Sequence, residues 1–461
     1  MKLKLQFKFS IHPKIKCNTL YSVFFDKYNK KSSKNLIHIP AIKDIDKPQP
    51  FEYHGQKLRT GTDFYTIPSA HSLELVKIEV VLDRGRFQEE KRLSSRFCAR
   101  MLKEGTIHYN SDAINDKFDF FGADFQVRYH LDYASFTLVS LKKHFPEVLP
   151  LFFEIIQWPK FDREELALLK KRAKSKLKLA EADNDAMSFR ILTEKIFGSQ
   201  HAYGYNSNYD DIDNIEIEDL YRYHEKNYCA PNFKVYLSGS VENDIVDIIT
   251  EYLYKIPTGS TNGSSLKLVN LEGETNQPGE FFIKNNYSFD AQSSVKLGKR
   301  MLKRDHPDYI GMHFLNTIMG GFFGSRLMQN IREKKGLTYN IYSDLEPMKY
   351  DGYFIIGTDI KTENIKQVIG LIYDEIDILQ NELIPVKEMN TVSNYIKGYL
   401  VSALDGVFSK AEIVKLLTLE NMEVEWIYDF FDHIDNIKAE KVRQLAKNYL
   451  KKDQLFTVVV N

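Results

Sequence analysis

Residues 320–339 read GGFFGSRLMQNIREKKGLTY, and they predict a glycine-rich loop followed by a short amphipathic helix. Ser325 is placed to cap the start of this helix, and Leu327 and Ile331 give it one apolar stripe. Gly336 is placed to end the helix, because glycine tolerates the left-handed backbone of a helix C-terminus.

A strand is predicted directly after this helix, because Leu337–Ser343 has the composition of a strand. Arg332 would then lie near the end of the helix and Tyr339 on the neighbouring strand, so both side chains would face one place. The alternative interpretation is structural: an Arg paired at the surface and a Tyr in the packed face of the strand.

The whole run closely resembles a stretch in the second half of the pitrilysin and mitochondrial-processing-peptidase family of zinc metallopeptidases. There a glycine-rich turn precedes a Ser-Arg-Leu helix, and an Arg and a Tyr lie seven residues apart, as Arg332 and Tyr339 do here. The resemblance implies that these two residues are catalytic and point at the carbonyl of a bound peptide. It also implies that the loop binds substrate, while its two aromatic residues could instead anchor the turn; the loop residues are Gly320, Gly321, Phe322, Phe323 and Gly324.

Composition sets limits on the class of protein. The chain has 461 residues with 43% hydrophobic content, enough for two or more domains with cores of their own. Its formal net charge is zero, so nothing indicates a nucleic-acid partner, and no apolar run is long enough for a transmembrane segment. Cys17, Cys98 and Cys229 form no CxxC pair, which favours a reducing compartment. We therefore expect a cytoplasmic location, with periplasm or organelle left open.

Four regions are predicted along the chain. Residues 1–35 form a basic N-terminal extension, either an edge segment or a targeting segment, whose role the sequence does not define. Residues 36–256 form an N-terminal peptidase-like domain, residues 257–280 a linker rich in Gly, Ser and Pro, and residues 281–461 a C-terminal peptidase-like domain. The same order of strands and helices returns after the linker, which points to an internal duplication with α+β topology in both domains.

Hydrophobic periodicity predicts the elements of each half. The first half is predicted to have strands at 73–82, 125–128, 133–141 and 232–238, and helices at 89–103, 111–121, 147–157, 163–181, 186–197, 217–228 and 245–254. The second half is predicted to have strands at 293–297, 338–345, 353–359 and 455–460, and helices at 307–318, 362–380 and 386–400, with two or three more between 409 and 450. The family resemblance implies that each half is an α/β sandwich, a mixed sheet packed by helices, and that the chain is one half of a clam-like peptidase.

In the family the first half carries the zinc motif His-x-x-Glu-His on a helix before a Gly-Thr turn. The run Met101–Thr106 marks that turn here, and the two His positions before it are Arg96 and Arg100 while the general base is Ala99. Arginine offers no lone pair to a metal, and alanine cannot accept a proton from water. In the downstream helix, Leu166–Ala180 contains only Lys and Arg as charged residues, so a carboxylate ligand is also missing. We therefore expect no metal and no other cofactor in this chain.

The helix of the degenerate motif carries further features. Arg92, Arg96 and Arg100 are predicted to lie on one stripe, where neighbours such as Glu89 and Glu104 could compensate the like charges. The stripe is either a salt-bridged or solvated face, or a basic strip facing a partner or an acidic peptide. Cys98 is predicted to be core. His201, Tyr203 and Tyr205 are predicted to pack, with a substrate role as the alternative.

Two functions are compatible with these residues. In the first, the chain is the zinc-free subunit of a heterodimeric metallopeptidase and is inactive alone. Arg332 and Tyr339 would stabilise the oxyanion in a site whose zinc belongs to a partner subunit of similar length, and unstructured peptide would bind as an added strand at a sheet edge. In the second, the chain is a non-enzymatic scaffold or peptide-binding subunit of a larger complex. Whether the chain forms a homodimer in isolation is left open by the sequence.

Overall fold

The computed structural model describes residues 45–70, 73–259, 276–288 and 291–461. The predicted basic extension, residues 1–35, lies outside these ranges, as do residues 260–275 of the predicted linker. Within the described ranges, no helix combines the length and the apolar composition that a membrane span requires.

The first half forms a six-stranded sheet with the order β1-β2-β6-β3-β5-β4. Its strands are β1 (His54–Lys57), β2 (Asp63–Pro68), β3 (Leu75–Leu82), β4 (Asp124–Tyr129), β5 (Ala134–Leu141) and β6 (Phe233–Gly239). Only the β2–β6 pair is parallel, so the sheet is mixed. The helices are α2 (Ser94–Met101), α3 (Ser111–Phe120), α4 (Phe145–Gln157), α5 (Arg163–Ala182), α6 (Asn184–Phe197), α7 (Tyr209–Asn214), α8 (Ile217–Asn227) and α9 (Asn243–Lys255).

The second half forms a five-stranded sheet with the order β7-β11-β8-β10-β9. Its strands are β7 (Glu280–Ile283), β8 (Ser293–Arg300), β9 (Thr338–Pro347), β10 (Gly352–Ile360) and β11 (Phe456–Val460). The helices are α10 (Tyr309–Asn316), α11 (Ile365–Asn381), α12 (Val386–Ala403), α13 (Val407–Leu419), α14 (Trp426–Asn436) and α15 (Ala439–Tyr449), with the helical turns η5 (Thr317–Gly321) and η6 (Met328–Glu333) around the glycine-rich loop.

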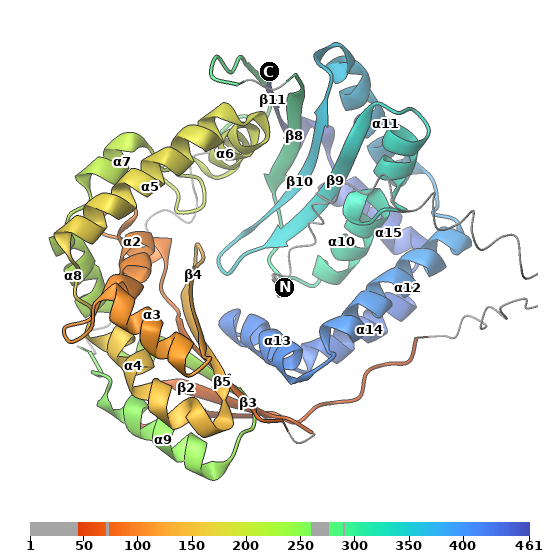
Figure 1. Ribbon diagram of the computed structural model, residues 1–461. Helices are drawn as coiled ribbons and strands as arrows, with labels where there is room; N and C mark the ends of the chain where they lie inside the picture. The colour runs from red at the N-terminus through yellow and green to blue at the C-terminus, as the bar shows by residue number, and fades with distance from the viewer. Residues whose placement is uncertain (1–44, 71–72, 260–275, 289–290) are drawn as a thin grey trace, which may run out of the picture.

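The two sheets share one plan. The order β2-β6-β3-β5-β4 in the first sheet corresponds strand by strand to β7-β11-β8-β10-β9 in the second. In each sheet the first and last of these five strands in the chain form the parallel pair, β2–β6 and β7–β11. The prediction of two α+β domains with mixed sheets and a duplicated topology is therefore confirmed. In Figure 1 the halves lie side by side, and the edge strand β4 is on the side of the first half that faces the second.

Each half places one helix on the sheet of the other. Helix α6 of the first half packs on β8 and β11, and helix α13 of the second half packs on β2 and β6. Phe197 lies in one of these apolar clusters with Val458, and Tyr236 lies in the other with Val414. This reciprocal exchange buries apolar surface on both sheets and holds the two halves together.

Four charged side chains close a ring across the α13 contact. Lys77 and Glu79 project from β3, and Glu412 and Lys415 project from α13. Lys415 Nζ lies 2.7 Å from Glu79 and 2.6 Å from Glu412, and Lys77 Nζ lies 2.6 Å from Glu412. The four side chains are between 4% and 12% exposed, so each charge depends on its partners rather than on water.

The structure adds short strands that periodicity did not predict, namely β1, β2 and β7. They are four to six residues long, which is too short for an alternating pattern to stand out. β7 starts at Glu280, the last residue of the predicted linker. The predicted helix at 89–103 is also shorter than expected, because Leu93 adopts a left-handed conformation with φ 72° and the helix begins only at Ser94.

The turn between β9 and β10 docks onto the first half at Asp132. Tyr203 donates a hydrogen bond to this carboxylate, and the backbone N–H of Lys349 donates another at 3.4 Å. Burial raises the pKa of Asp132 to about 6, although both hydrogen bonds oppose the shift. The carboxyl group is therefore held against the second half partly in its neutral form.

A pH dependence of stability with a defined sign follows for Asp132. Its folded-state pKa lies above the ordinary 3.8, so the folded chain binds the proton more tightly than the unfolded chain does. The resulting stabilisation is complete below the ordinary value and is lost as the pH rises through about 6. We expect wild type to gain about 1 kcal/mol over Asp132→Asn when the pH is lowered from 7 to 5, measured by urea unfolding. A constant difference between the two proteins over this range would contradict the expectation.

Candidate functional site

The glycine-rich loop is shaped by close approach to β9. A Cβ on Gly320 would lie 2.3 Å from the backbone nitrogen of Ser343, and a Cβ on Gly324 would lie 2.5 Å from the ring of Phe322. Ser343 Oγ also donates a hydrogen bond to Asn316 Oδ1 at 2.7 Å, which ties the strand to the end of α10. The loop can therefore pass this strand only where a side chain is absent.

Gly320→Ala is expected to lower the free energy of unfolding by about 1–3 kcal/mol, because the new methyl overlaps the backbone of β9. Gly370→Ala on α11 is the matched control, since nothing lies within 4 Å of its Cβ position and alanine has the higher helix propensity. Chemical unfolding of both variants checks the expectation. Equal free energies of unfolding for the two variants would show that the loop accommodates the added methyl group without loss of stability.

The two aromatic residues of the loop have different environments. The ring of Phe322 packs against Tyr395 of α12 with centroids 4.8 Å apart, so it anchors the turn. Phe323 is 61% exposed, and its ring makes a cation–π contact with the guanidinium of Arg332, whose Cζ lies 5.0 Å from the ring centroid. Of the predicted peptide-contacting aromatic residues, Phe323 is thus the one that reaches the surface.

The helix after the loop is held to its neighbours by charged and polar pairs. Arg326 makes two hydrogen bonds of 2.8 Å with the carboxylate of Glu388 on α12. The last turn of this helix is a wide π turn, because the N–H of Lys334 donates to the carbonyl of Gln329, five residues earlier, at 3.1 Å. The helix then ends at Gly336 with φ 63°, as the sequence predicts.

The predicted cap of this helix is wrong in one respect. The hydroxyl of Ser325 is buried and makes no hydrogen bond within the described part of the chain, whereas the Ser325 carbonyl accepts one from the N–H of Gln329 at 2.9 Å. Ser325 is fully inside the packed loop, so its backbone rather than its side chain starts the helix.

Arg332 and Tyr339 stand on neighbouring elements at the surface. The turn η6, which carries Arg332, packs directly against β9, which carries Tyr339 and is an edge strand. Tyr339 is 86% exposed, and its hydroxyl makes no hydrogen bond to another described residue. The Arg332 side chain is 31% exposed, and Nη1 lies 3.5 Å from the carboxylate of the adjacent Glu333. The tyrosine is therefore not in the packed face of the strand, and both groups are accessible from outside.

Helix α2 of the first half carries the degenerate motif. Glu89 holds the start of this helix by accepting hydrogen bonds from the N–H groups of Leu93 and Ser95, each at 3.1 Å, and from the hydroxyl of Tyr205 at 2.7 Å. Burial raises the pKa of Glu89, against these hydrogen bonds. The Glu89 carboxylate thus accepts hydrogen bonds at the start of α2 and forms no ion pair with Arg92, Arg96 or Arg100 in the described structure.

The motif positions cannot form the zinc site of the family. Every residue of α2 is buried except Arg96 and Arg100, and Ala99 at the base position has no exposed surface. The guanidinium groups carry no lone pair for a metal, and a methyl group cannot activate water. Within the residues that the structure describes, no group of three His, Cys, Asp or Glu side chains is arranged to hold a metal ion. Helix α5, which lies beside α2, contributes no carboxylate from Leu166 to Ala180.

Two other arginines near α2, Arg86 and Arg92, donate hydrogen bonds to backbone carbonyl groups. Arg86 donates to the carbonyls of Ala202 and Tyr205, each at 3.1 Å, and lies over the Tyr205 ring at 4.2 Å. Arg92 donates to the Ser199 carbonyl at 2.9 Å, and one of its nitrogens lies 4.0 Å from Asp211. The role of Arg86 could not be predicted from the sequence, because Arg86 precedes the helix and its acceptors lie more than a hundred residues away in the chain.

Arg96 and Arg100 differ from these two. Neither makes a hydrogen bond or an ion pair to another described residue. Burial and the neighbouring charge of Arg100 lower the pKa of Arg96, and burial lowers the pKa of Arg100. The hydroxyl of Tyr129 on β4 is an electrostatic neighbour of both. The predicted stripe of three is interrupted, because Arg92 precedes α2 and is paired, whereas Arg96 and Arg100 on α2 have no partner among the described residues.

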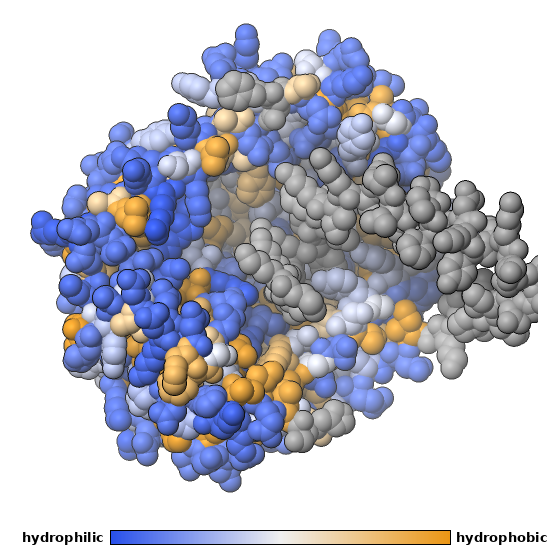
Figure 2. Space-filling model, in the orientation of Figure 1, coloured by the Kyte–Doolittle hydropathy of each residue, from blue (hydrophilic) through white to orange (hydrophobic). Residues whose placement is uncertain are grey.

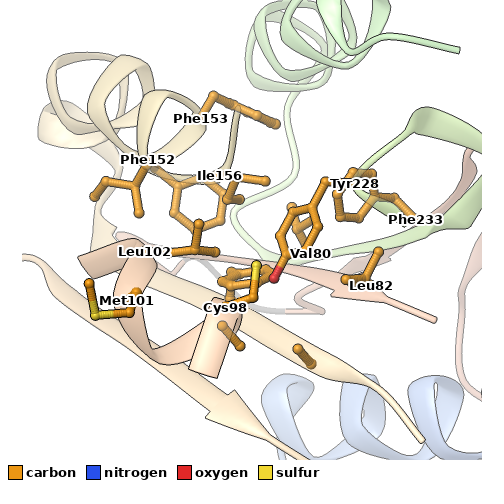
Figure 3. Close-up of a cluster of buried hydrophobic side chains, with 14 of the residues drawn as sticks. Val80, Leu82, Cys98, Met101, Leu102, Phe152, Phe153, Ile156, Tyr228 and Phe233 are labelled. Atoms are coloured by element: carbon orange, nitrogen blue, oxygen red, sulfur yellow. The ribbon is translucent and has the colours of Figure 1, made fainter. Parts of the chain in front are cut away.

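The remaining candidates pack as predicted. Cys98 points into an apolar cluster with Val80 and Tyr228, and burial raises the pKa of its thiol (Figure 3). His201 and Tyr203 are also buried, and the His201 ring stacks on Phe197 with centroids 5.3 Å apart. Cys98 thus belongs to the core of the first half, whereas Tyr203 and Phe197 lie in the apolar cluster shared with Val458 of the second half.

Comparison with known proteins agrees with this architecture. Residues 66–204 match the family model described as insulinase (peptidase family M16), and residues 214–395 match the peptidase M16 inactive domain. The "Uncharacterized zinc protease YmxG" of Bacillus subtilis is 21% identical over 388 residues, which cover 83% of this chain and 92% of that protein. From the same organism, the "Probable inactive metalloprotease YmfF" is 22% identical over 296 residues, covering 63% of this chain and 67% of that protein.

Solved structures have the same fold. A peptidase M16 inactive domain from Pseudomonas fluorescens matches with a TM-score of 0.81 at 23% identity, covering 89% of this chain and 98% of that one. The periplasmic protease PqqL from Escherichia coli matches with a TM-score of 0.73 at 14% identity, covering 95% of this chain and 50% of that one. From both family models and the altered motif on α2, the chain belongs to peptidase family M16, the pitrilysin-type metallopeptidases, and to the type that lacks the zinc-binding residues.

Proposed function

We propose that this chain is the zinc-free subunit of a two-subunit peptidase. It binds an unstructured peptide and presents Arg332 and Tyr339 to a site whose zinc, ligands and general base belong to a partner chain of similar length. The first half of the chain has no base or metal ligand at the motif positions Arg96, Ala99 and Arg100, so the chain alone is inactive.

The accessibility of Arg332 and Tyr339 carries this proposal. Tyr339 is 86% exposed, and its hydroxyl has no acceptor among the described residues. The Arg326–Glu388 pair ties the helix of Arg332 to α12, and Tyr339 directly follows Thr338, which pairs with Ile360 of β10. The Tyr339 hydroxyl has no described acceptor, and among the described residues Arg332 contacts only the adjacent Glu333 and the Phe323 ring, so both groups can donate to an oxygen of a bound peptide.

The chemistry of the pair is oxyanion stabilisation. As negative charge develops on the carbonyl oxygen of the peptide, the guanidinium of Arg332 and the hydroxyl of Tyr339 donate hydrogen bonds to it. Such bonds are stronger to the oxyanion than to the neutral carbonyl, so they lower the barrier rather than only tighten binding.

The comparisons support a division of labour between two chains. One relative is named a probable inactive metalloprotease and another, from the same organism, an uncharacterized zinc protease, so one organism has both kinds of chain. This chain corresponds to 50% of PqqL, so two chains of this size make up the length of that protease. A neighbouring gene for a chain with His-x-x-Glu-His and without the Arg/Tyr pair would identify the partner.

The test measures peptidase activity on unstructured peptides for this chain alone, for the zinc-bearing chain alone and for the mixture, with the metal content of each chain. We expect activity only in the mixture. A stable complex without activity would favour the scaffold function, and zinc with activity in this chain alone would overturn both.

Tyr339→Phe is expected to lower the turnover of the mixture at least about tenfold, because one donor to the oxyanion is lost while the ring remains. Assembly, followed by size-exclusion chromatography, should not change. Tyr287→Phe is the control, since Tyr287 is 74% exposed on the same half. Equal activity of both variants would remove Tyr339 from the site.

A further inference from the structure

We propose that Arg96 and Arg100 form a carboxylate-binding site, and that the carboxylate belongs to a peptide bound beside β4. The inference rests on the peptide-binding part of the proposed function, not on the Arg332 and Tyr339 pair. It gives a binding role to the positions where the family has its zinc ligands.

The first observation is that two like charges are stacked without compensation. Arg96 and Arg100 are four residues apart on α2 and are its only residues that reach the surface. Like charges at this spacing repel each other. Neither has a hydrogen-bond or ion-pair partner among the described residues, although Arg86 and Arg92, close by, are satisfied by carbonyl groups. Two half-buried guanidinium groups in this arrangement form a bidentate receptor for an anion.

The second observation concerns the electric charge of the groups around Arg96 and Arg100. Burial and the neighbouring charge of Arg100 lower the pKa of Arg96. The nearby carboxylate of Glu89 accepts hydrogen bonds from Leu93, Ser95 and Tyr205 rather than from either arginine. Helix α5 packs against α2 and bears only Lys and Arg as charged residues from Leu166 to Ala180. In Figure 2 the surface over these helices is predominantly hydrophilic. An anion for the two arginines must therefore come from outside this part of the chain.

The third observation identifies the molecule that carries the anion. β4 packs against α2 and is the edge strand of its sheet, so one side of its backbone pairs with no other described strand (Figure 1). An extended peptide is the ligand that a free strand edge selects. A peptide carries its negative charge as the side chain of Asp or Glu, or as its C-terminal carboxylate. Both forms present the same planar group to the guanidinium pair.

The test measures binding of fluorescent unstructured peptides to this chain alone by anisotropy, so it does not depend on turnover. One pair of peptides differs only in an internal Glu or Gln, and a second pair has a free or an amidated C-terminus. We expect wild type to bind the carboxylate member of at least one pair about tenfold more tightly, the value of a charge-assisted bidentate contact. The pair that shows the difference identifies the source of the carboxylate.

The variant Arg96→Gln/Arg100→Gln is expected to lose this discrimination and to melt at the wild-type temperature or above, because a repulsive contact is removed. Arg96→Lys/Arg100→Lys keeps the charge without the fork geometry and should discriminate less than wild type. The control Arg163→Gln/Arg172→Gln removes the same charge from the exposed face of α5 and should bind as wild type does.

Three results would overturn the inference. These are equal affinity of wild type for both members of each pair, retained discrimination in Arg96→Gln/Arg100→Gln, and an equal loss in the control variant. None of them affects the shared-site proposal, which stands or falls on the turnover of the mixture with Arg332 and Tyr339 altered.

Discussion

Arg332→Ala is expected to lower the kcat of the assembled pair about 100- to 1,000-fold, the effect of removing one preorganised oxyanion donor. KM should change little, because the hydrogen bond strengthens only as charge develops on the carbonyl oxygen. The measurement is steady-state hydrolysis of an unstructured peptide by the mixture, at saturating concentrations of this chain. Assembly of the complex should be unaffected, since the Arg332 side chain makes one ion-pair contact, to its neighbour Glu333.

Two further variants test whether the guanidinium of Arg332 acts in catalysis or whether its positive charge alone explains the effect. Arg332→Lys keeps a positive charge but loses the planar fork, so we expect a fall in kcat that is smaller than that of alanine. Lys335→Ala removes an exposed charge from the same turn and should behave as wild type. If Arg332→Ala and Lys335→Ala turned over peptide equally, the guanidinium would have no place in the chemistry and the scaffold function would be favoured.

Lys415→Met is expected to destabilise the chain by about 3–5 kcal/mol, because it leaves Glu79 and Glu412 buried with one lysine between them. The Lys415 and Glu79 side chains are 10% and 4% exposed, so water cannot replace the lost partner. Urea unfolding measures the effect. Lys441→Met is the matched control: its Nζ lies 2.6 Å from Asp308, but its side chain is 55% exposed, and a loss below about 1 kcal/mol is expected.

The double variant Glu79→Gln/Lys415→Met tests the cause. Removing both charges leaves the Lys77–Glu412 pair intact, so the double variant should be more stable than Lys415→Met alone. Burial would raise the pKa of Glu79, but the charges of Lys415 and Lys77 outweigh burial and lower it. Its stabilisation is therefore present above the ordinary value of 4.5 and is lost as the pH falls below it. Equal stability of the single and double variants would show that the ring does not link the halves.

Most of the fold was predictable because its signal is local. Long helices such as α5 and α11 and buried strands such as β3 have a clear period over many residues, and they lie where the pattern places them. The short strands β1 and β7 have too few residues for a period, and pairing with a neighbour is what makes them strands. The exchange of α6 and α13 between the halves has no sequence signal, since it depends on which sheet each apolar face meets.

The family, the duplicated topology, and the substitution of Arg96, Ala99 and Arg100 at the zinc motif could all be predicted from the sequence. These features depend on the type and spacing of residues that lie near one another along the chain. Which arginines are paired could not be predicted in this way. Arg92, just before α2, donates to a carbonyl 107 residues away, whereas Arg96 on α2 has no described acceptor. Pairing depends on distant segments that folding brings together, so the difference between a structural and a ligand-binding arginine becomes visible only in three dimensions.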